Sequence, residues 1–129
     1  MNTPVIFEIA KLLKEKGFNK KTDSAYVDTT PFSENENDLV EYAFPQNHNE
    51  KEHRISAPTI AEVVMLLYEK HGIWIEVVWD IEINKEVKWY SGITKIGDSS
   101  ELEVFQSNPC HSPTEAYEAA IIYTLKNLI

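Results

Sequence analysis

The sequence has little of several features that would narrow its class. Cys110 is the only cysteine, so no intrachain disulfide can form, and no cysteine pair has the spacing of a zinc site. The four glycines stand singly, which excludes a glycine-rich phosphate loop. The apolar runs are far too short to span a bilayer, and residues 1–11 lack the pattern of a secretion signal. We therefore expect a cytoplasmic protein with no cofactor, no metal and no membrane contact.

Basic residues are also scarce. The chain has 12 Lys and Arg against 21 Asp and Glu, a formal net charge of −9. Since proteins grip phosphates with Lys and Arg, a nucleic-acid partner is disfavoured. Residues 22–50 contain no Lys or Arg but seven acids: Asp23, Asp28, Glu34, Glu36, Asp38, Glu41 and Glu50. This segment is either a solvated acidic loop region or a surface that binds a basic partner or mimics a phosphate backbone.

What the chain does have is enough apolar residues for a core. Its 129 residues, 43% of them hydrophobic, suit a single globular domain. We expect an α+β fold over residues 1–129. Residues 1–57 should form an N-terminal helix and an irregular or β-hairpin region, and residues 58–129 a core in α-β-β-β-α order.

The most regular segment is Ile73–Ile83, where apolar residues alternate for the length of a long strand. This pattern predicts a half-buried strand of an antiparallel sheet, with one face in the core and the other face outward. The predicted core face carries Ile73, Ile75, Val77, Trp79, Ile81 and Ile83, and the outer face carries Trp74, Glu76, Val78, Asp80 and Glu82.

A second strand, Val87–Ile93, should pair with the first. Placing Ile83 opposite Val87 leaves a three-residue loop, Asn84–Glu86, and keeps apolar residues on the core face. This register also places Glu82 opposite Lys88. Residues 101–107 should form a third strand, with Leu102 and Val104 inward.

Capping residues predict three helices. The first should start with Thr3 as N-cap and Pro4 at the first helical position, and end before Gly17. The second, 58–71, has Thr59 and Glu62 at capping-box spacing and ends at Gly72, and the third, 112–128, starts with Ser112, Pro113 and Glu115. The second and third should cover one face of the sheet, and the first should pack at its edge or against them.

Residues 19–55 have a less regular pattern. Residues 24–30 and 39–44 are predicted as short strands around a polar turn at 33–37, and Pro45 favours a position at a sheet edge. The polar segment Gln46–Arg54 is interpreted as an exposed loop.

No catalytic residue can be assigned. Cys110 and His111 are neighbours, whose side chains diverge, so they do not form a nucleophile–base pair. The acids Glu101 and Glu103, like Glu76, Asp80 and Glu82, fit a polar strand face without chemistry. The aromatic residues are more informative, because Trp74, Val78 and Tyr90 should form an apolar strip on the outer face of the sheet. Either residues 26–44 cover this strip or it is an interface.

Two resemblances can be stated. The order from Pro58 onward is similar to the double-stranded-RNA-binding domain fold, but Thr114–Glu118 replace the lysine cluster with which that family grips phosphate. The motifs Leu13–Asn19, Ser56–Thr59, Tyr68–Ile73 and Glu115–Ala120 resemble those of small phage- and prophage-borne proteins of Bacteroidetes. That resemblance implies a genomic context and no catalytic residues.

Three functions follow as hypotheses. The first is a non-enzymatic phage accessory protein that binds another protein or itself, with Trp74, Val78, Tyr90, Glu34, Glu36, Asp38 and Glu41 as the candidate surface. The second is an acidic inhibitor that mimics nucleic acid on a host enzyme, which requires the acids of residues 22–50 to share one face. The third is a small hydrolase, which requires a pocket that contains an acid or a histidine with a shifted pKa.

Overall fold

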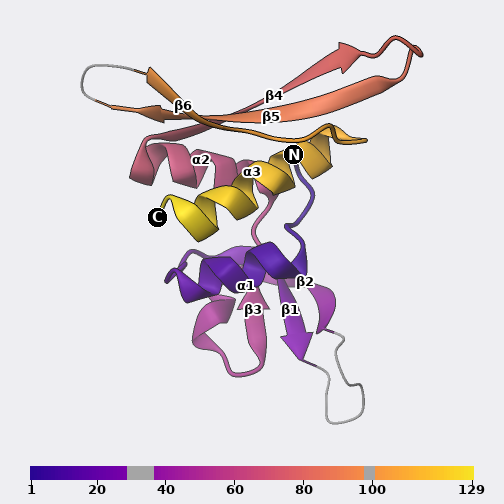
Figure 1. Cartoon of the computed structure of the whole chain (residues 1–129). Coiled ribbons are helices and arrows are strands. Elements are labelled where there is room, and N and C mark those ends of the chain that lie inside the picture. Colours follow the sequence, from indigo (N-terminus) through magenta and orange to yellow (C-terminus); the bar gives the residue numbers. More distant parts are fainter. Residues whose placement is uncertain (29–36, 98–100) are drawn as a thin grey trace. The chain divides into compact units, whose positions relative to one another are not determined.

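The structure is a computed structural model that describes residues 1–28, 37–97 and 101–129, except for the side chains of 28, 37 and 101–103. Among these residues it has three α-helices and two antiparallel sheets of three strands each, which confirms the α+β class (Figure 1). The chain divides into two compact units, Asn2–Thr59 and Ile60–Ile129, the latter including Met1. This boundary lies two residues from the predicted one, and the single domain stays a prediction.

The C-terminal unit has the predicted α-β-β-β-α order. It consists of α2 (Ile60–His71), β4 (Ile73–Ile81), β5 (Val87–Ile96), β6 (Glu101–Gln106) and α3 (Pro113–Asn127), with strand order β4-β5-β6. Both helices lie on the same face of the sheet (Figure 1). Between sheet and helices lies the core, made of fully or almost fully buried residues: Ile60, Val63, Leu67, Ile73, Ile75, Ile93, Ala116, Ala120, Ile121 and Leu125.

The third strand contains an irregularity that the predicted alternation did not include. A bulge between Ile93 and Thr94 shifts the pairing of β5 with β6. Phe105 therefore lies opposite the buried Ile93, and its ring stacks on Tyr123 of α3 at 4.4 Å. Alternation alone does not reveal a bulge. Val104 lies in this bulge and is half-buried, so its inward direction stays a prediction. The side chain of Leu102 lies outside the described residues.

The start of α3 confirms its predicted cap. The Ser112 hydroxyl accepts a hydrogen bond from the Glu115 amide at 3.1 Å, and Pro113 is the first helical residue. The Glu115 carboxylate accepts from the His111 amide at 3.0 Å, one residue before the position that a standard capping box would use. The helix α2 begins directly after Thr59, and its capping box stays a prediction.

Gly72 joins α2 to β4 in a left-handed conformation, with φ of 64°. Its amide donates to the Tyr68 carbonyl at 3.0 Å, and its carbonyl accepts from the Ile96 amide at 2.8 Å. A Cβ at this position would lie 3.1 Å from the Ile96 carbonyl oxygen. The predicted glycine stop is therefore also the first point of contact between β4 and β5.

The N-terminal unit contains α1 (Phe7–Glu15) and a sheet of β1 (Thr22–Asp28), β2 (Asn37–Gln46) and β3 (Arg54–Ser56), in the order β2-β1-β3. The two predicted strands exist and pair, and Pro45 lies on the edge strand β2, as expected. Most of their predicted turn, 33–37, lies outside the described residues. The helix α1 contacts β3 of this same sheet, and the Phe7 ring meets Tyr26 edge-on at 5.4 Å.

The predicted start of the first helix is wrong, whereas its end is confirmed. Residues 3–6 are not helical because this segment pairs with the chain ahead of α2: Pro4 bridges Thr59, and the Val5 amide donates to the Pro58 carbonyl at 2.9 Å. The helix begins at Phe7 without a side-chain cap. At its end Gly17 has φ of 85°, and the amide of Phe18 donates back to Leu13 at 3.0 Å, as in a Schellman motif.

The expectation that Gln46–Arg54 is an exposed loop is confirmed for residues 50–53 but is wrong for His48. A short 3₁₀ turn, His48–Glu50, holds the His48 side chain in a fully buried position. Its Nε2 lies 3.2 Å from the Thr22 carbonyl oxygen, and its ring packs on Tyr42 at 4.5 Å. The Arg54 guanidinium covers the same tyrosine ring. A polar segment is buried here because its histidine finds one carbonyl and one aromatic face.

We predict that stability falls as the pH drops through the histidine range. Burial lowers the pKa of His48, the bond to Thr22 opposes this, and the positive charges of Arg54 and Lys51 lower the pKa further. The unfolded chain, with a histidine pKa of about 6.5, therefore takes up a proton that the folded chain resists. The free energy of unfolding in urea, followed by circular dichroism, should be smaller at pH 5.5 than at pH 7.5.

The variant His48→Phe keeps a ring in this position and removes the titrating group. It should lose the part of the pH dependence that lies near pH 6.5, while His53→Phe, at an exposed position, should keep it. Equal pH dependence in wild type and His48→Phe would contradict the assignment.

A second prediction concerns the glycine between α2 and β4. Gly72→Ala should lower stability by about 1–2 kcal/mol, the usual cost of a left-handed conformation for a residue with a Cβ. The close Ile96 carbonyl should add to this cost. Gly17→Ala is the matched control, because Gly17 also has a positive φ but a Cβ there would meet nothing within 4 Å. Urea unfolding should show the larger loss for Gly72→Ala, and equal losses would mean that the Ile96 contact adds nothing.

Candidate interaction surface

The β4–β5 hairpin has a different register from the predicted one. Val87 pairs with Ile81, and Trp89 with Trp79, so the predicted pairing is wrong by two residues. The loop still contains three residues, Ile83–Lys85, but it lies one residue earlier than predicted. The reason is local: Lys85 takes the left-handed position with φ of 66°, and its amide donates to the Glu82 carbonyl at 2.8 Å.

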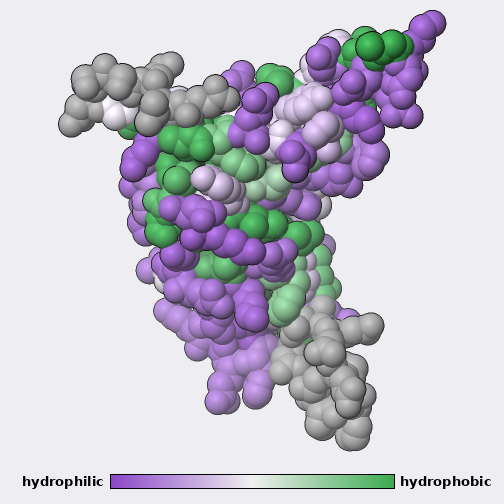
Figure 2. Space-filling model, in the orientation of Figure 1, coloured by the Kyte–Doolittle hydropathy of each residue, from purple (hydrophilic) through white to green (hydrophobic). Residues whose placement is uncertain are grey.

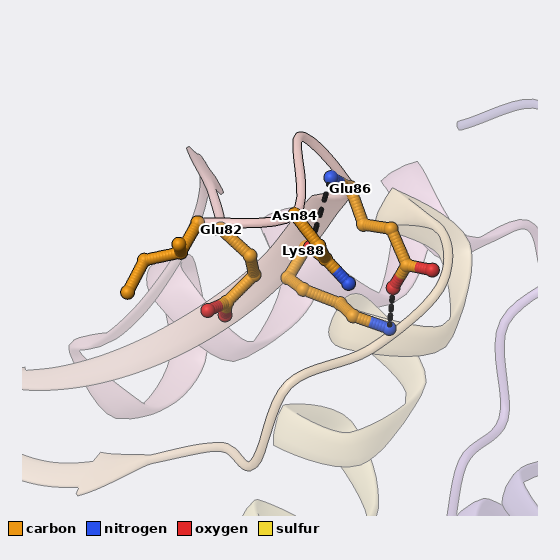
Figure 3. Close-up of a pocket in the computed structure, with 5 residues that line it drawn as sticks. Glu82, Asn84, Glu86 and Lys88 are labelled. Carbon is orange, nitrogen blue, oxygen red and sulfur yellow. Dashed lines mark hydrogen bonds and ion pairs between the residues drawn. The ribbon is translucent and has the colours of Figure 1, made fainter.

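The side chains at the hairpin end also differ from the prediction. Asp80, not Glu82, lies opposite Lys88, and the Lys88 ammonium is 3.4 Å from the Glu86 carboxylate. Asn84 accepts a hydrogen bond from the Glu86 amide at 3.2 Å, which closes the loop (Figure 3). Glu82 instead accepts a hydrogen bond of 3.0 Å from the Tyr90 hydroxyl. The predicted Glu82–Lys88 pair is therefore wrong.

Only the first half of the predicted core face is buried. Ile73 and Ile75 are 1% and 2% exposed, whereas Trp79 and Ile81 are 58% and 55% exposed, and Ile83 at the loop is fully exposed. Figure 1 shows the reason, because the hairpin extends well beyond α2 and α3. We call the exposed apolar group of Trp79, Ile81, Ile83 and Val87 the hairpin patch. Figure 2 shows hydrophobic surface near the end of the hairpin, bordered by hydrophilic residues.

The aromatic strip was predicted on the opposite face of the hairpin. Val78 lies opposite Tyr90, and Trp74 meets the Tyr68 ring edge-on at 5.5 Å. Trp74 is 40% and Val78 49% exposed, while Tyr90 is half-buried. Val78 and Tyr90 are thus cross-strand neighbours, whereas Trp74 pairs with Thr94 and contacts α2, so a continuous strip of the three residues stays a prediction. A cover from residues 26–44 would come from the N-terminal unit and stays a prediction.

The acids proposed for the same surface are not all described. Glu34 and Glu36 lie outside the described residues. Asp38 pairs with Val27, and Glu41 with Ser24, so these two acids are three positions apart on β2. Because strand side chains alternate, Asp38 and Glu41 point to opposite faces of the sheet.

Two hollows on the described surface are small or open. One of about 100 Å³ lies on the outer face of the sheet and is lined by Glu76, Val78, Tyr90, Ser91, Gly92 and Gln106. Another is the open depression at the hairpin end shown in Figure 3. Small-molecule sites are usually clefts or cavities of about 300–1,000 Å³ that bury most of the ligand surface. Neither hollow is lined by His48 or by Glu118, the pKa of which is raised by burial and by Glu115.

Residues able to hold a metal do not gather in the described part of the chain, where no group of three His, Cys, Asp or Glu could bind an ion. The Cys110 thiol donates to the Asn108 carbonyl at 3.4 Å, and the backbone of Cys110 pairs with Trp89. Cys110 and His111 accordingly lie in the segment that connects β6 to α3.

Comparison of the chain with protein-family models, curated proteins and solved structures found no match. The resemblances to phage-borne proteins and to the double-stranded-RNA-binding fold therefore stay predictions. None of the helices described is both long enough and apolar enough to cross a membrane.

The sequence reasoning missed the hairpin patch, although the lengths of the elements contain the signal. A helix of 12 residues is roughly 18 Å long, whereas a strand of nine residues extends roughly 30 Å. A strand this long, flanked by helices this short, should leave its far end uncovered. The alternation alone gave the two faces but not the extent of the cover.

We predict that Glu82 controls the ionisation of Tyr90. Its hydrogen bond is the main cause that raises the pKa of Tyr90, followed by partial burial and the charges of Glu82 and Asp80. Glu82→Gln should therefore lower the pKa of Tyr90 towards its ordinary value. Asp80→Asn is the matched control and should lower the pKa less. NMR titration of ¹³C-labelled tyrosine measures both, and an unchanged Tyr90 pKa in Glu82→Gln would contradict the bond.

Proposed function

We propose that the protein is a non-enzymatic, phage-type accessory protein that binds another protein, and that the hairpin patch is its contact surface. The observation that carries the proposal is the exposure of Trp79, Ile81, Ile83 and Val87 on one hairpin. A contiguous apolar group of this kind, bordered by polar residues, commonly marks a binding site. Tryptophan is also the residue type most enriched among the side chains that dominate binding energy.

Local structure supports a preformed surface. The loop is closed by backbone hydrogen bonds between Glu82 and Glu86 and between Glu82 and Lys85. The Tyr90–Glu82 bond and the Lys88–Glu86 ion pair lie beside it. Because the hairpin is already ordered, little conformational entropy would be lost when a partner binds.

The two alternative functions have less support. An inhibitor that mimics nucleic acid requires its acids on one face, and Asp38 and Glu41 point to opposite faces. A hydrolase requires an enclosed pocket with a perturbed acid or histidine, and the two described hollows are not lined by His48 or Glu118. No observation favours either of them over protein binding.

The test is affinity capture from host cells with matched variants. Trp79→Ser/Ile81→Ser removes the centre of the hairpin patch, and Phe44→Ser removes an aromatic side chain that is 77% exposed on the N-terminal unit. We expect mass spectrometry to find a reproducible partner with wild type and with Phe44→Ser. The double variant should recover at least tenfold less, because truncating one central tryptophan commonly costs about 2 kcal/mol or more.

Two results would count against the proposal. One is the absence of any reproducible partner from infected or lysogenic cells. The other is equal recovery with wild type and with the double variant, after circular dichroism has shown that both are folded.

A further inference from the structure

The strand β4 lies at the edge of its sheet. The backbone groups on its free side point away from β5 and could pair with another strand. Gly72 and Glu82 direct their backbone groups to β5, as their hydrogen bonds to Ile96 and Glu86 show. Because backbone direction alternates along a strand, the odd-numbered residues Ile73–Ile81 direct their N–H and C=O groups away from β5. No strand of the described sheet lies on that side.

The usual protections of an edge strand are weak in β4. Natural edge strands carry charged side chains, above all lysine, or proline or a bulge, which hinder pairing with another chain. The segment Ile73–Ile81 has no lysine and no proline, its charged residues are Glu76 and Asp80, and its pairing with β5 is free of shifts. The edge strand β2 of the other sheet, in contrast, contains Pro45. Exposed apolar side chains flank the edge of β4 on both faces: Trp79 and Ile81 on one, Trp74 and Val78 on the other.

We propose that the partner of β4 is the same strand of a second copy of this chain, so that two sheets join edge to edge in an antiparallel dimer. The inference rests on the proposed protein-binding function and names the partner for one edge of the hairpin. A two-fold axis is the natural symmetry, because an antiparallel strand pair formed by identical segments is self-complementary.

The charges of β4 select one register. With the axis at Val77, Ile75 lies opposite Trp79 of the second copy, and Ile73 opposite its Ile81. On the other face Glu76 then lies opposite Val78, and Asp80 opposite Trp74. Moving the axis to residue 76 places Glu76 opposite itself, and moving it to residue 78 places Glu76 opposite Asp80. Like charges directly opposite destabilise a strand pair. The register at Val77 avoids both clashes, and it places the exposed Trp79 and Ile81 beside the buried Ile75 and Ile73 of the second copy.

One hydrogen bond of the single copy must be exchanged. The Ile81 amide, which lies on the free edge, donates to the Asp80 carboxylate at 2.8 Å. In the dimer this amide would donate to the Ile73 carbonyl of the second copy instead. The exchange concerns only the two ends of the ladder, and the central pairs from Ile75 to Trp79 form without it.

The first experiment uses a matched pair of variants at one exposed position. Val78→Lys places a lysine opposite Glu76 of the second copy, and Val78→Glu places a glutamate there, twice in each dimer. Sedimentation equilibrium of the full chain should show a reversible dimer for wild type, tighter for Val78→Lys and weaker for Val78→Glu. The two variants should differ roughly tenfold or more in dimer dissociation constant at low salt.

The control removes the effect of overall charge. Thr94→Lys and Thr94→Glu change the net charge equally on the same face, but Thr94 lies on the central strand β5, opposite Trp74. These two variants should differ far less than the Val78 pair. Circular dichroism establishes that all four are folded.

A second measurement reads the register directly. In a Cys110→Ser background, Glu76→Cys/Val78→Cys should form interchain disulfides under mild oxidation, because the two positions face each other across the axis at Val77. Glu76→Cys/Asp80→Cys is the control, since these positions face each other only in the register at residue 78, and it should cross-link far less.

A wild-type chain that stays monomeric at high micromolar concentration would overturn the dimer, as would equal effects of the Val78 and Thr94 pairs or stronger cross-linking of the control. If such a monomer still captures a partner that Trp79→Ser/Ile81→Ser loses, the dimer fails and the proposed function stands. A dimer with the expected register but no captured partner supports the inference and counts against binding to a different protein.

Discussion

The mismatch in length between a long hairpin and two short helices determines most features of the C-terminal unit. The helices bury the near half of one hairpin face, where Ile73, Ile75 and Ile93 supply the core. Burying side chains of this size stabilises a fold by about 1.5–3 kcal/mol each, so this half is enough to anchor β4 and β5. The far half has no such cover, and its tryptophan and isoleucine side chains remain at the surface. The hairpin thus contributes its near half to stability and leaves its far half available for binding.

Predictions from sequence were most successful where a single residue type dictates the backbone. Gly17 and Gly72 take the left-handed positions expected of helix stops, and Ser112 caps its helix through a direct hydrogen bond. The alternation in β4 gave the two faces of the strand correctly, because a register error of two residues does not exchange them. The α-β-β-β-α order followed from these signals together.

Two of the failures share a physical cause, which is competition from contacts that are distant in sequence. Thr3 could cap a helix, but the Val5 amide has a better acceptor in Pro58, and residues 3–6 are not helical. His48 has the sequence surroundings of a loop residue, but Thr22 and Tyr42 provide it with a buried site. At the hairpin loop, Lys85 takes the left-handed conformation. The apolar pattern does not distinguish this loop position from the one predicted a residue later. The exposed half of the hairpin could be inferred only from the lengths of the elements around it.

The partial cover of the hairpin by helices also affects how its edge strand could pair with another chain. A strand edge that is flanked by apolar side chains carries a risk of aggregation unless charge or geometry limits the ways in which it can pair. In the proposed dimer the limiting residues are Glu76 and Asp80, which disfavour the two registers next to the one centred on Val77. Asp80 adds a second restraint, because its carboxylate occupies the Ile81 amide in the single copy. In the proposed dimer these two acids would not prevent pairing but would make it selective, which is the difference between an aggregation-prone edge and a specific interface. The acidic residues on the outer face, which suggested no chemistry in the sequence, would then have a physical role in the choice of partner.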